Sequence, residues 1–118
     1  MTTPATMNNY TLAFTAPAET GDSIKVDLLN VKKASMVLRA INHKLRQQVL
    51  KLIDEQKKIT VTEIYIKLRL EQSVASQHLA ILRKAGFVNT ERDGKFIYYT
   101  VNAPRIEELN RFVDSLLN

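Results

Sequence analysis

Hydrophobic residues recur at helical spacing over most of the chain, but not at its start. Residues 1–22 are rich in Thr, Ala, Asn and Pro and show no sustained period. Tyr10, Leu12 and Phe14 alternate as they would in a strand, yet three alternating positions favour this less than an unstructured tail. We therefore predict a flexible N-terminal arm over 1–22 and a folded domain over 23–118.

Three helices are predicted in succession after this arm. Ile24, Leu28 and Val31 follow each other at spacings of four and three, and Asp22 or Ser23 could cap the start of their helix. The helical period continues at Ala34, Val37, Leu38, Ile41, Leu45, Val49, Leu52 and Ile53. Asn42 and His43 interrupt this second stripe and predict a break between two helices.

A short fourth helix is predicted over about 61–69. The apolar residues of this segment alternate as in a strand, but its first residues have the Thr-x-x-Glu form of a capping box. Thr60 would be the N-cap, with Glu63 reaching back to it. Ile59 and Ile64 stand where a hydrophobic staple places them, so the capping chemistry decides for a helix.

The next segment, from Glu71 to Gly86, predicts an amphipathic helix that Gly86 ends as the left-handed residue. Its apolar side consists of Ala75, Leu79 and Leu82. The opposite side and its flanks consist of Ser73, Gln77, Ala80, Lys84, Ser76 and Arg83. Small polar residues without a carboxylate form a surface that can approach an uncharged or negatively charged partner closely.

A β-hairpin and a last helix complete the pattern. Residues 88–92 and 95–101 flank Asp93-Gly94, a strong hairpin signal, with Arg92 and Lys95 at the tip. Tyr98 and Tyr99 fall on opposite faces of the second strand, so we expect one to pack inward and the other to be exposed. Pro104 suits the first turn of a helix whose apolar stripe is Ile106, Leu109, Val113, Leu116 and Leu117.

Composition narrows the possible functions. The 118 residues contain 17 Lys and Arg against 12 Asp and Glu, a net charge of +5 that favours an anionic partner. No cysteine is present, which excludes disulfides, thiolate metal sites and cysteine nucleophiles. Catalytic motifs such as a glycine-rich phosphate loop or a serine elbow are missing, so no enzyme is expected. No apolar run has the length of a membrane span, and we expect a soluble, cytoplasmic protein that does not bind membranes.

Several of these segments together resemble one family. The run LEQSVASQHLAILRKAGFV at 70–88 resembles the recognition-helix signature of the ArsR-type bacterial transcriptional regulators. Upstream, the segment AINHKLR at 40–46 is similar to that family's stretch at the entry to its second or third helix. Downstream, Asp93-Gly94-Lys95 with Tyr98 and Tyr99 is similar to its wing. The likeness covers about residues 34 to 103.

This resemblance implies a mainly α-helical winged helix-turn-helix with a small β-hairpin that binds double-stranded DNA as a homodimer. It implies a near-palindromic operator, usually repression, and a dimer contact through terminal helices at 22–33 and 104–117. Predicted DNA contacts are Gln72, Ser73, Ser76, Gln77, His78, Arg83, Lys84, Arg92, Lys95 and Arg46. Predicted dimer contacts are Ile24, Leu28, Val31, Ile106, Leu109, Val113, Leu116 and Leu117.

The two histidines have plainer interpretations as well. His78 lies near the apolar side of its helix, where a histidine is more often packed and hydrogen-bonded than a ligand; only the resemblance places it by the DNA backbone. His43, at a helix junction, is expected to cap or to pack at the surface. Lys32, Lys33, Arg39, Lys44, Arg46 and Lys51 form a basic run without an intervening acid, in which some side chains would contact the backbone of DNA and others solvent.

The chain departs from the best-known members of the family at their metal sites. Thr60 and Thr62 stand where those members have a Cys-x-Cys pair, and residues 106–118 contain no histidine for the second site. We predict a metal-independent regulator without a cofactor and with an unknown effector. Two alternatives stay open: a winged helix used as a protein-interaction module, and a protein that binds DNA without sequence preference. An organic effector or a protein signal at the dimer interface is a further possibility.

Overall fold

The computed structural model describes residues 6–7, 10–15 and 23–118, which belong to two units, 1–38 and 39–118. The division falls inside α1 (Leu28–Ile41), after Leu38. Of the arm predicted over 1–22, residues 1–5, 8–9 and 16–22 lie outside the described residues. Within the described part of the chain, no helix is long and apolar enough to cross a membrane.

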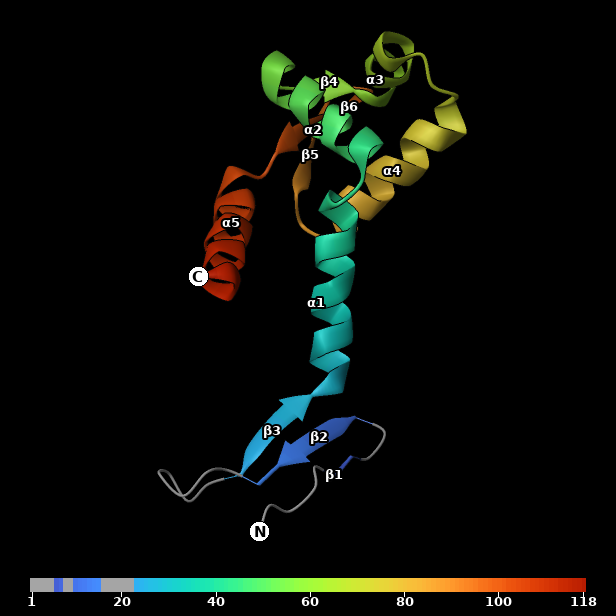
Figure 1. The fold of residues 1–118 in the computed structure, drawn as a ribbon. Helices are drawn as coiled ribbons and strands as arrows, with labels where there is room; N and C mark the ends of the chain where they lie inside the picture. The colour runs from blue at the N-terminus through green and yellow to red at the C-terminus, as the bar shows by residue number, and fades with distance from the viewer. Residues whose placement is uncertain (1–5, 8–9, 16–22) are drawn as a thin grey trace. The chain divides into compact units, whose positions relative to one another are not determined.

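The first unit contains a three-stranded antiparallel sheet (Figure 1). Its strands β1 (Thr6–Met7), β2 (Thr11–Phe14) and β3 (Ile24–Asp27) follow each other in that order across the sheet. The preference for an unstructured tail over a strand was therefore wrong at residues 11–14. The predicted helix over 22–33 was wrong at its start, because Ile24 lies in β3. Residues 28–33 are helical as predicted, but they belong to α1, which begins at Leu28 and continues to Ile41.

The helix begins late because its N-cap is Asp27 rather than Asp22 or Ser23. The Asp27 carboxylate accepts hydrogen bonds from the backbone N–H groups of Leu29 and Asn30, at 3.0 and 3.1 Å. The backbone N–H of Leu28 donates to the carbonyl of Tyr10, at 2.6 Å, which ties the first helical residue to the sheet.

Strand register sorts the sheet of the first unit into an apolar and a polar face. Leu12 pairs with Val26 and Phe14 with Ile24, so these four residues share a face. The alternate pairs, Thr11 with Asp27 and Ala13 with Lys25, place both charges on the other face.

The second unit confirms the predicted order of helix, short helix, amphipathic helix, hairpin and helix. Its elements are α2 (Lys44–Gln56), β4 (Ile59–Thr60), α3 (Val61–Leu68), α4 (Gln72–Lys84), β5 (Val88–Asp93), β6 (Phe96–Val101) and α5 (Ala103–Leu117). β4, which the sequence did not predict, pairs with β6, so the hairpin becomes a three-stranded sheet of order β4-β6-β5. The predicted break at Asn42 and His43 is confirmed between α1 and α2.

Apolar side chains from the helices and this sheet form one core. The fully buried residues are Val49, Ile53, Ile59, Ile64, Ala75, Leu79, Leu82 and Phe87. The cap that predicted α3 is present, since Thr60 Oγ1 accepts from the backbone N–H of Glu63 at 3.3 Å. This packing fixes α3 and α4 as consecutive helices joined by a three-residue turn over 69–71.

The hairpin differs from its prediction in two details. Asp93 pairs with Phe96, so the two turn residues are Gly94 and Lys95 rather than Asp93 and Gly94. Gly94 has a φ of 63°, which suits a type II′ turn with glycine first. Tyr98 and Tyr99 are both half-buried instead of one buried and one exposed, because β4 pairs beside both of them.

Candidate nucleic-acid interface

Helix α4 presents a polar surface held in place by an apolar one. Ala75, Leu79 and Leu82 are fully buried and anchor the helix on the core, as predicted. Six of the predicted contact residues on this helix are exposed: Gln72, Ser73, Ser76, Gln77, Arg83 and Lys84. The helix contains no acidic residue, so its exposed face carries positive charge and no negative charge.

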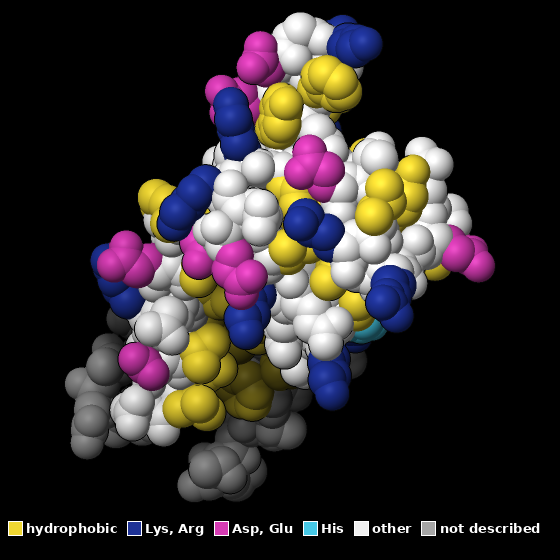
Figure 2. All heavy atoms as spheres, turned by 90° about the horizontal axis from the view of Figure 1, so that it is seen from above, with side chains coloured by type: hydrophobic (Ala, Val, Ile, Leu, Met, Phe, Trp, Pro, Cys, Tyr) yellow, Lys and Arg dark blue, Asp and Glu magenta, His cyan; other side chains and the backbone are white. Residues whose placement is uncertain are grey.

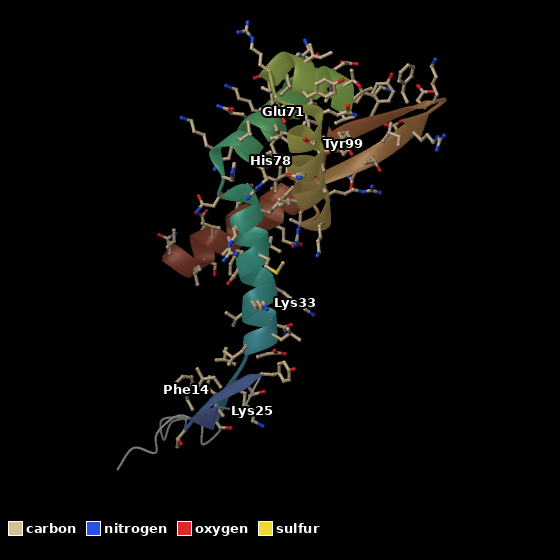
Figure 3. All side chains as sticks on the ribbon, turned by 90° about the vertical axis from the view of Figure 1, so that its right-hand side faces the viewer. Phe14, Lys25, Lys33, Glu71, His78 and Tyr99 are labelled. Atoms are coloured by element: carbon tan, nitrogen blue, oxygen red, sulfur yellow. The ribbon has the colours of Figure 1, made fainter. Side chains whose placement is uncertain are left out.

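The start of α4 lacks a side-chain cap. Glu71 is the N-cap residue and forms no capping hydrogen bond with its side chain (Figure 3). The free N–H groups of the first turn therefore stay available, and they stand at the positive end of the helix dipole. The preceding turn is closed by Arg69, whose φ of 55° is left-handed, and by a hydrogen bond from Leu70 N to Tyr65 O at 2.9 Å.

His78 does not belong to the exposed face of α4. It is half-buried, and its Nδ1 lies 3.3 Å from Nη1 of Arg46 (Figure 3). Its ring centroid is 5.0 Å from that of His43. Burial lowers the pKa of His78 below the ordinary value of 6.5, and the positive charges of His43 and Arg46 lower it further.

Arg46 is buried, with 7% of its surface exposed, although the sequence predicted it as a DNA contact. Its Nε donates to Ala40 O at 2.6 Å and its Nη2 to Arg39 O at 2.9 Å. A guanidinium engaged in this way cannot also reach a phosphate, so we correct the prediction. The spacing of 46, 49, 50 and 53 on the buried side of α2 is the signal that could have shown it.

His43 caps α2, one of the two roles expected for it. Its Nδ1 accepts from the backbone N–H groups of Leu45 and Arg46, at 3.2 and 3.4 Å. The same ring thus takes part in a cluster with Arg46 and His78, which the sequence did not predict.

The hairpin formed by β5 and β6 separates the acidic and basic side chains of β5 onto opposite faces. The register pairs Arg92 with Ile97 on one face, and it places Glu91 and Asp93 on the other face beside Phe96. Arg92 and Lys95 are exposed, as predicted for the tip, and Arg92 Nε donates to Gly94 O at 3.2 Å. The turn predicted one residue too early had set Arg92 beside Lys95, whereas the structure sets it opposite Ile97.

Basic side chains do not gather in one block on the face shown in Figure 2. There Lys and Arg lie singly among acidic, apolar and neutral side chains. On this face the positive charge is therefore spread over individual side chains and forms no broad basic patch.

Helix α5 carries an uncovered apolar surface in the second unit. Ile106, Leu109 and Val113 line a groove of about 590 Å³ together with α2 residues such as Leu50. Beyond the groove Leu116 and Leu117 are 66% and 78% exposed. Phe112, which the sequence analysis omitted, is also exposed. None of the residues of α5 is buried in the single chain.

The predicted dimer contacts at the N-terminal side belong to different elements. Ile24 is an exposed residue of β3, whereas Leu28 and Val31 lie on the first turns of α1, half-buried and exposed respectively.

The two threonines at the positions of a family metal site have structural roles in this chain. Thr60 pairs with Tyr98 in the sheet and caps α3 with its hydroxyl, and Thr62 follows it on α3. Threonine hydroxyls are poor ligands for thiophilic metals. Among the described residues, no three His, Asp or Glu side chains gather as a metal site would require.

Comparison with known proteins agrees with this geometry. The pattern of the family described as "Bacterial regulatory protein, arsR family" matches residues 43–90, from the cap of α2 into β5. An uncharacterized HTH-type transcriptional regulator of Methanocaldococcus jannaschii is 33% identical over 72% of this chain and 96% of its own length. The transcriptional activator HlyU of Vibrio cholerae is 36% identical over 68% of this chain and 73% of its own.

A solved structure supports the same assignment. The crystal structure of the transcriptional repressor PagR of Bacillus anthracis superposes with a TM-score of 0.58 and 28% identity, over 74% of this chain and 99% of that one. Its coverage and that of the sequence relatives, together with the exposed face of α4, lead to one conclusion. The chain belongs to the ArsR family and is a DNA-binding transcriptional regulator with a winged helix-turn-helix fold.

Proposed function

We propose that the protein is a homodimeric repressor that reads a near-palindromic operator without a metal ion. The observation that carries this proposal is the exposed, carboxylate-free face of α4, supported from behind by three fully buried side chains. A rigid helix with such a face suits the major groove, where phosphates flank the base edges on both sides.

Each exposed residue of α4 has a role that fits its chemistry. Gln77 lies in the middle of the exposed face, and a glutamine amide can form two hydrogen bonds with adenine. Gln72, Ser73 and Ser76 stand at the uncapped start of the helix, where hydroxyl, amide and backbone N–H groups suit phosphates and nearby bases. Arg83 and Lys84 would contact the DNA backbone at the other end of α4.

The hairpin would contact DNA with its tip. Arg92 and Lys95 are exposed there and suit phosphates or the minor groove. Because Glu91 and Asp93 share the opposite face of the hairpin, the Arg92 face is the one expected to approach the duplex. Arg46 has no part in this contact, since its guanidinium is buried.

The dimer contact would use the apolar surface of α5. Ile106, Leu109 and Val113 border the groove, and Leu116 and Leu117 extend the surface toward the end of the helix. Leu28 and Val31 of α1 would contribute from the N-terminal side, with Ile24 added from β3. Two copies related by a two-fold axis would then present two α4 helices to two half-sites.

The donor groups of the chain support the proposed metal independence. Threonines replace the thiolates at one family site, and residues 106–118 lack histidine at the other. The proposed regulation therefore acts through a signal other than a thiolate-bound metal. Relatives include an activator and a repressor, and repression is the outcome we propose for this chain. A regulator of this kind needs no catalytic residue, and we propose no enzymatic activity.

The test is binding to DNA from the upstream region of its own gene. Fluorescence anisotropy in rising salt would compare labelled fragments of that region with random duplex of equal length. We expect tighter binding to one fragment by about three orders of magnitude and a linear dependence on the logarithm of salt concentration. Equal binding to all duplexes would indicate a nonspecific DNA-binding protein, and absence of binding would favour a protein-interaction module.

Two substitutions separate the roles of α4 and the hairpin. Gln77→Ala should reduce the preference for the specific fragment over random duplex. Lys95→Ala should weaken both by a similar factor and lower the salt slope by about one. The reverse pattern would overturn these assignments.

A further inference from the structure

The junction between α1 and α2 contains a polar cluster that DNA contact does not explain. The last carbonyl groups of a helix have no partner within it. Here they are capped from the first turn of α2, because Arg46 binds the carbonyls of Arg39 and Ala40, and Gln47 Nε2 donates to Ile41 O at 2.9 Å. The end of α1 and the start of α2 therefore form one hydrogen-bonded corner.

The positive charge of Arg46 is stabilised there without a carboxylate. In the described part of the chain, ion pairs join Arg105 to Glu108 and Arg111 to Glu107, both within α5. The guanidinium instead faces the carbonyl end of α1, which is the negative end of that helix dipole. The third nitrogen of the guanidinium, Nη1, faces α4 and lies 3.3 Å from Nδ1 of His78.

The hydrogen-bonding rules fix the protonation state of the His78 ring in this cluster. Arginine can only donate, so Nδ1 of His78 must be the acceptor and its ring carries the proton on Nε2. Nδ1 of His43 is the acceptor for the backbone N–H groups of Leu45 and Arg46. The hydrogen bond between Arg46 and His78 is complete only when the His78 ring is neutral.

We propose that Arg46 is a positioning residue for DNA recognition: through the neutral ring of His78 it holds α4 against the α1–α2 corner, and protonation of His78 weakens operator binding. This inference rests on the proposed role of α4 in contacting DNA. It assigns His78 to the support of α4 rather than to the DNA backbone.

The surroundings of His78 favour the neutral ring. The titratable and charged groups that act on it are His43 and Arg46, both positive when charged, and α1 contributes only the carbonyls already bound to Arg46. On α4 itself the residues one turn away are Val74, Ala75, Ile81 and Leu82, all apolar. A protonated His78 ring would have no acceptor nitrogen for Arg46. The hydrogen bond between them would be lost, and their two positive charges would repel each other.

The sign of the pH dependence distinguishes this role from direct phosphate contact. A histidine that binds phosphate does so better when charged, so acid would strengthen binding. A histidine that supports α4 as a neutral acceptor has the opposite effect, and acid would weaken binding.

The test measures affinity for the specific duplex from about pH 8 to about pH 5.5, at constant ionic strength. For the wild type we expect a loss of about tenfold or more on acidification. His78→Gln keeps an acceptor that does not titrate, so it should bind within about threefold of the wild type at neutral pH and show a flat profile. His78→Leu, which removes the acceptor, should lose about tenfold at neutral pH. Gln77→Ala serves as the control, with weaker binding but the wild-type slope.

Three results would overturn the proposal. They are wild-type binding that rises on acidification, a wild-type slope in His78→Gln, and neutral-pH binding by His78→Leu equal to that of the wild type.

A readout without DNA separates failure of this inference from failure of the proposed function. Hydrogen exchange of the α4 amides, together with nitrogen shifts of the His78 ring, can be followed over the same pH range. We expect an unprotonated Nδ1 at neutral pH, and faster exchange in acid for the wild type but not for His78→Gln. If the wild type bound no duplex at any pH, the proposed function would fail. The exchange experiment would still show whether Arg46 and His78 hold α4 in place. Unchanged hydrogen exchange of the α4 amides in acid would refute the support of α4 by His78, even if DNA bound well.

Discussion

Asn102 donates a hydrogen bond from its side-chain Nδ2 to the carbonyl of Gly86 at 2.8 Å, and so joins the start of α5 to the end of α4. Its backbone N–H donates to Phe87 O at 2.9 Å, and Arg105 Nε donates to Ala85 O at 3.1 Å. The helix proposed for dimerisation and the helix proposed for DNA recognition are thus directly connected.

Asn102→Ala tests the strength of this connection. Loss of the half-buried hydrogen bond should lower the free energy of unfolding by about 1 kcal/mol, measured by urea denaturation. Asn89→Ala, at an exposed position of β5, is the matched control and should change it by less than about 0.5 kcal/mol. Equal effects of the two variants would show that the Asn102 bond adds no stability.

The two described glycines with positive φ form a natural pair for a second test. Gly86 and Gly94 have φ values of 86° and 63°. A Cβ on Gly94 would meet open space, whereas a Cβ on Gly86 would lie 3.3 Å from Arg105 Nε. We expect Gly94→Ala to cost about 1 kcal/mol from backbone strain alone and Gly86→Ala to cost roughly 2 kcal/mol, measured by thermal or urea unfolding. A larger loss at Gly94 would contradict this account.

Thr60→Ala should lower the free energy of unfolding by about 1 kcal/mol, because it removes the hydroxyl that caps α3. Thr62→Ala is its control two residues later, where an exposed helical position should gain or lose only a few tenths of a kcal/mol. Urea denaturation of both variants makes the comparison. If Thr62→Ala were the more destabilising, the capping role of Thr60 would be untenable.

Leu116→Lys should raise the dissociation constant of the proposed dimer by at least about tenfold, because it places a charge in the apolar surface of α5. Leu116 is mostly exposed in the single chain, so the fold itself should be retained. Ser115→Lys adds the same charge at the neighbouring position, on the other side of the helix, and should leave the constant nearly unchanged. Sedimentation equilibrium gives both values, and equal weakening by the two variants would move the interface elsewhere.

The lowered pKa of His78 makes the stability of the DNA-free protein depend on pH. The unfolded chain binds a proton at His78 near pH 6.5, whereas the folded chain binds it only at lower pH. The stabilising effect of the neutral ring is therefore full above pH 6.5, and it is lost as pH falls from there through the lowered pKa. Denaturation at a series of pH values should show this decline, and His78→Gln should reduce its slope.

Local chemistry explains which elements could be predicted from the sequence. Three features depend only on neighbours within one or two turns, and the structure confirms all of them. They are the cap at Thr60, the apolar stripe at 75, 79 and 82, and the left-handed glycine at 86. Ile24, Leu28 and Val31 failed as a helical stripe because the same apolar residues also satisfy a strand followed by a helix. Only pairing with β2 decides between the two, and its partners lie ten residues earlier for Ile24 with Phe14 and fourteen earlier for Val26 with Leu12.

The misplaced site residues depend on contacts between segments. Arg46 reads as one more cation in a basic run until the corner between α1 and α2 brings the carbonyls of Arg39 and Ala40 to it. The pairing of the hairpin depends on a turn at Gly94 and Lys95, which sets Arg92 opposite Ile97, whereas a turn one residue earlier would set it opposite Lys95. The exposed contacts on α4 could be predicted because a single helix determines which of its own residues face outward.

One residue, Asp27, serves two elements at once, with its backbone paired to Thr11 in the sheet and its carboxylate capping α1. The sheet and the first turns of the helix are for that reason inseparable in protein engineering. A shortened chain that begins at Leu28 would fray at its first turn, and a hybrid that exchanges the N-terminal segment must supply Asp, Asn, Ser or Thr at position 27. A one-residue insertion at this point would turn the sheet by about 100° around the helix axis, so the joint tolerates substitution better than a change in length.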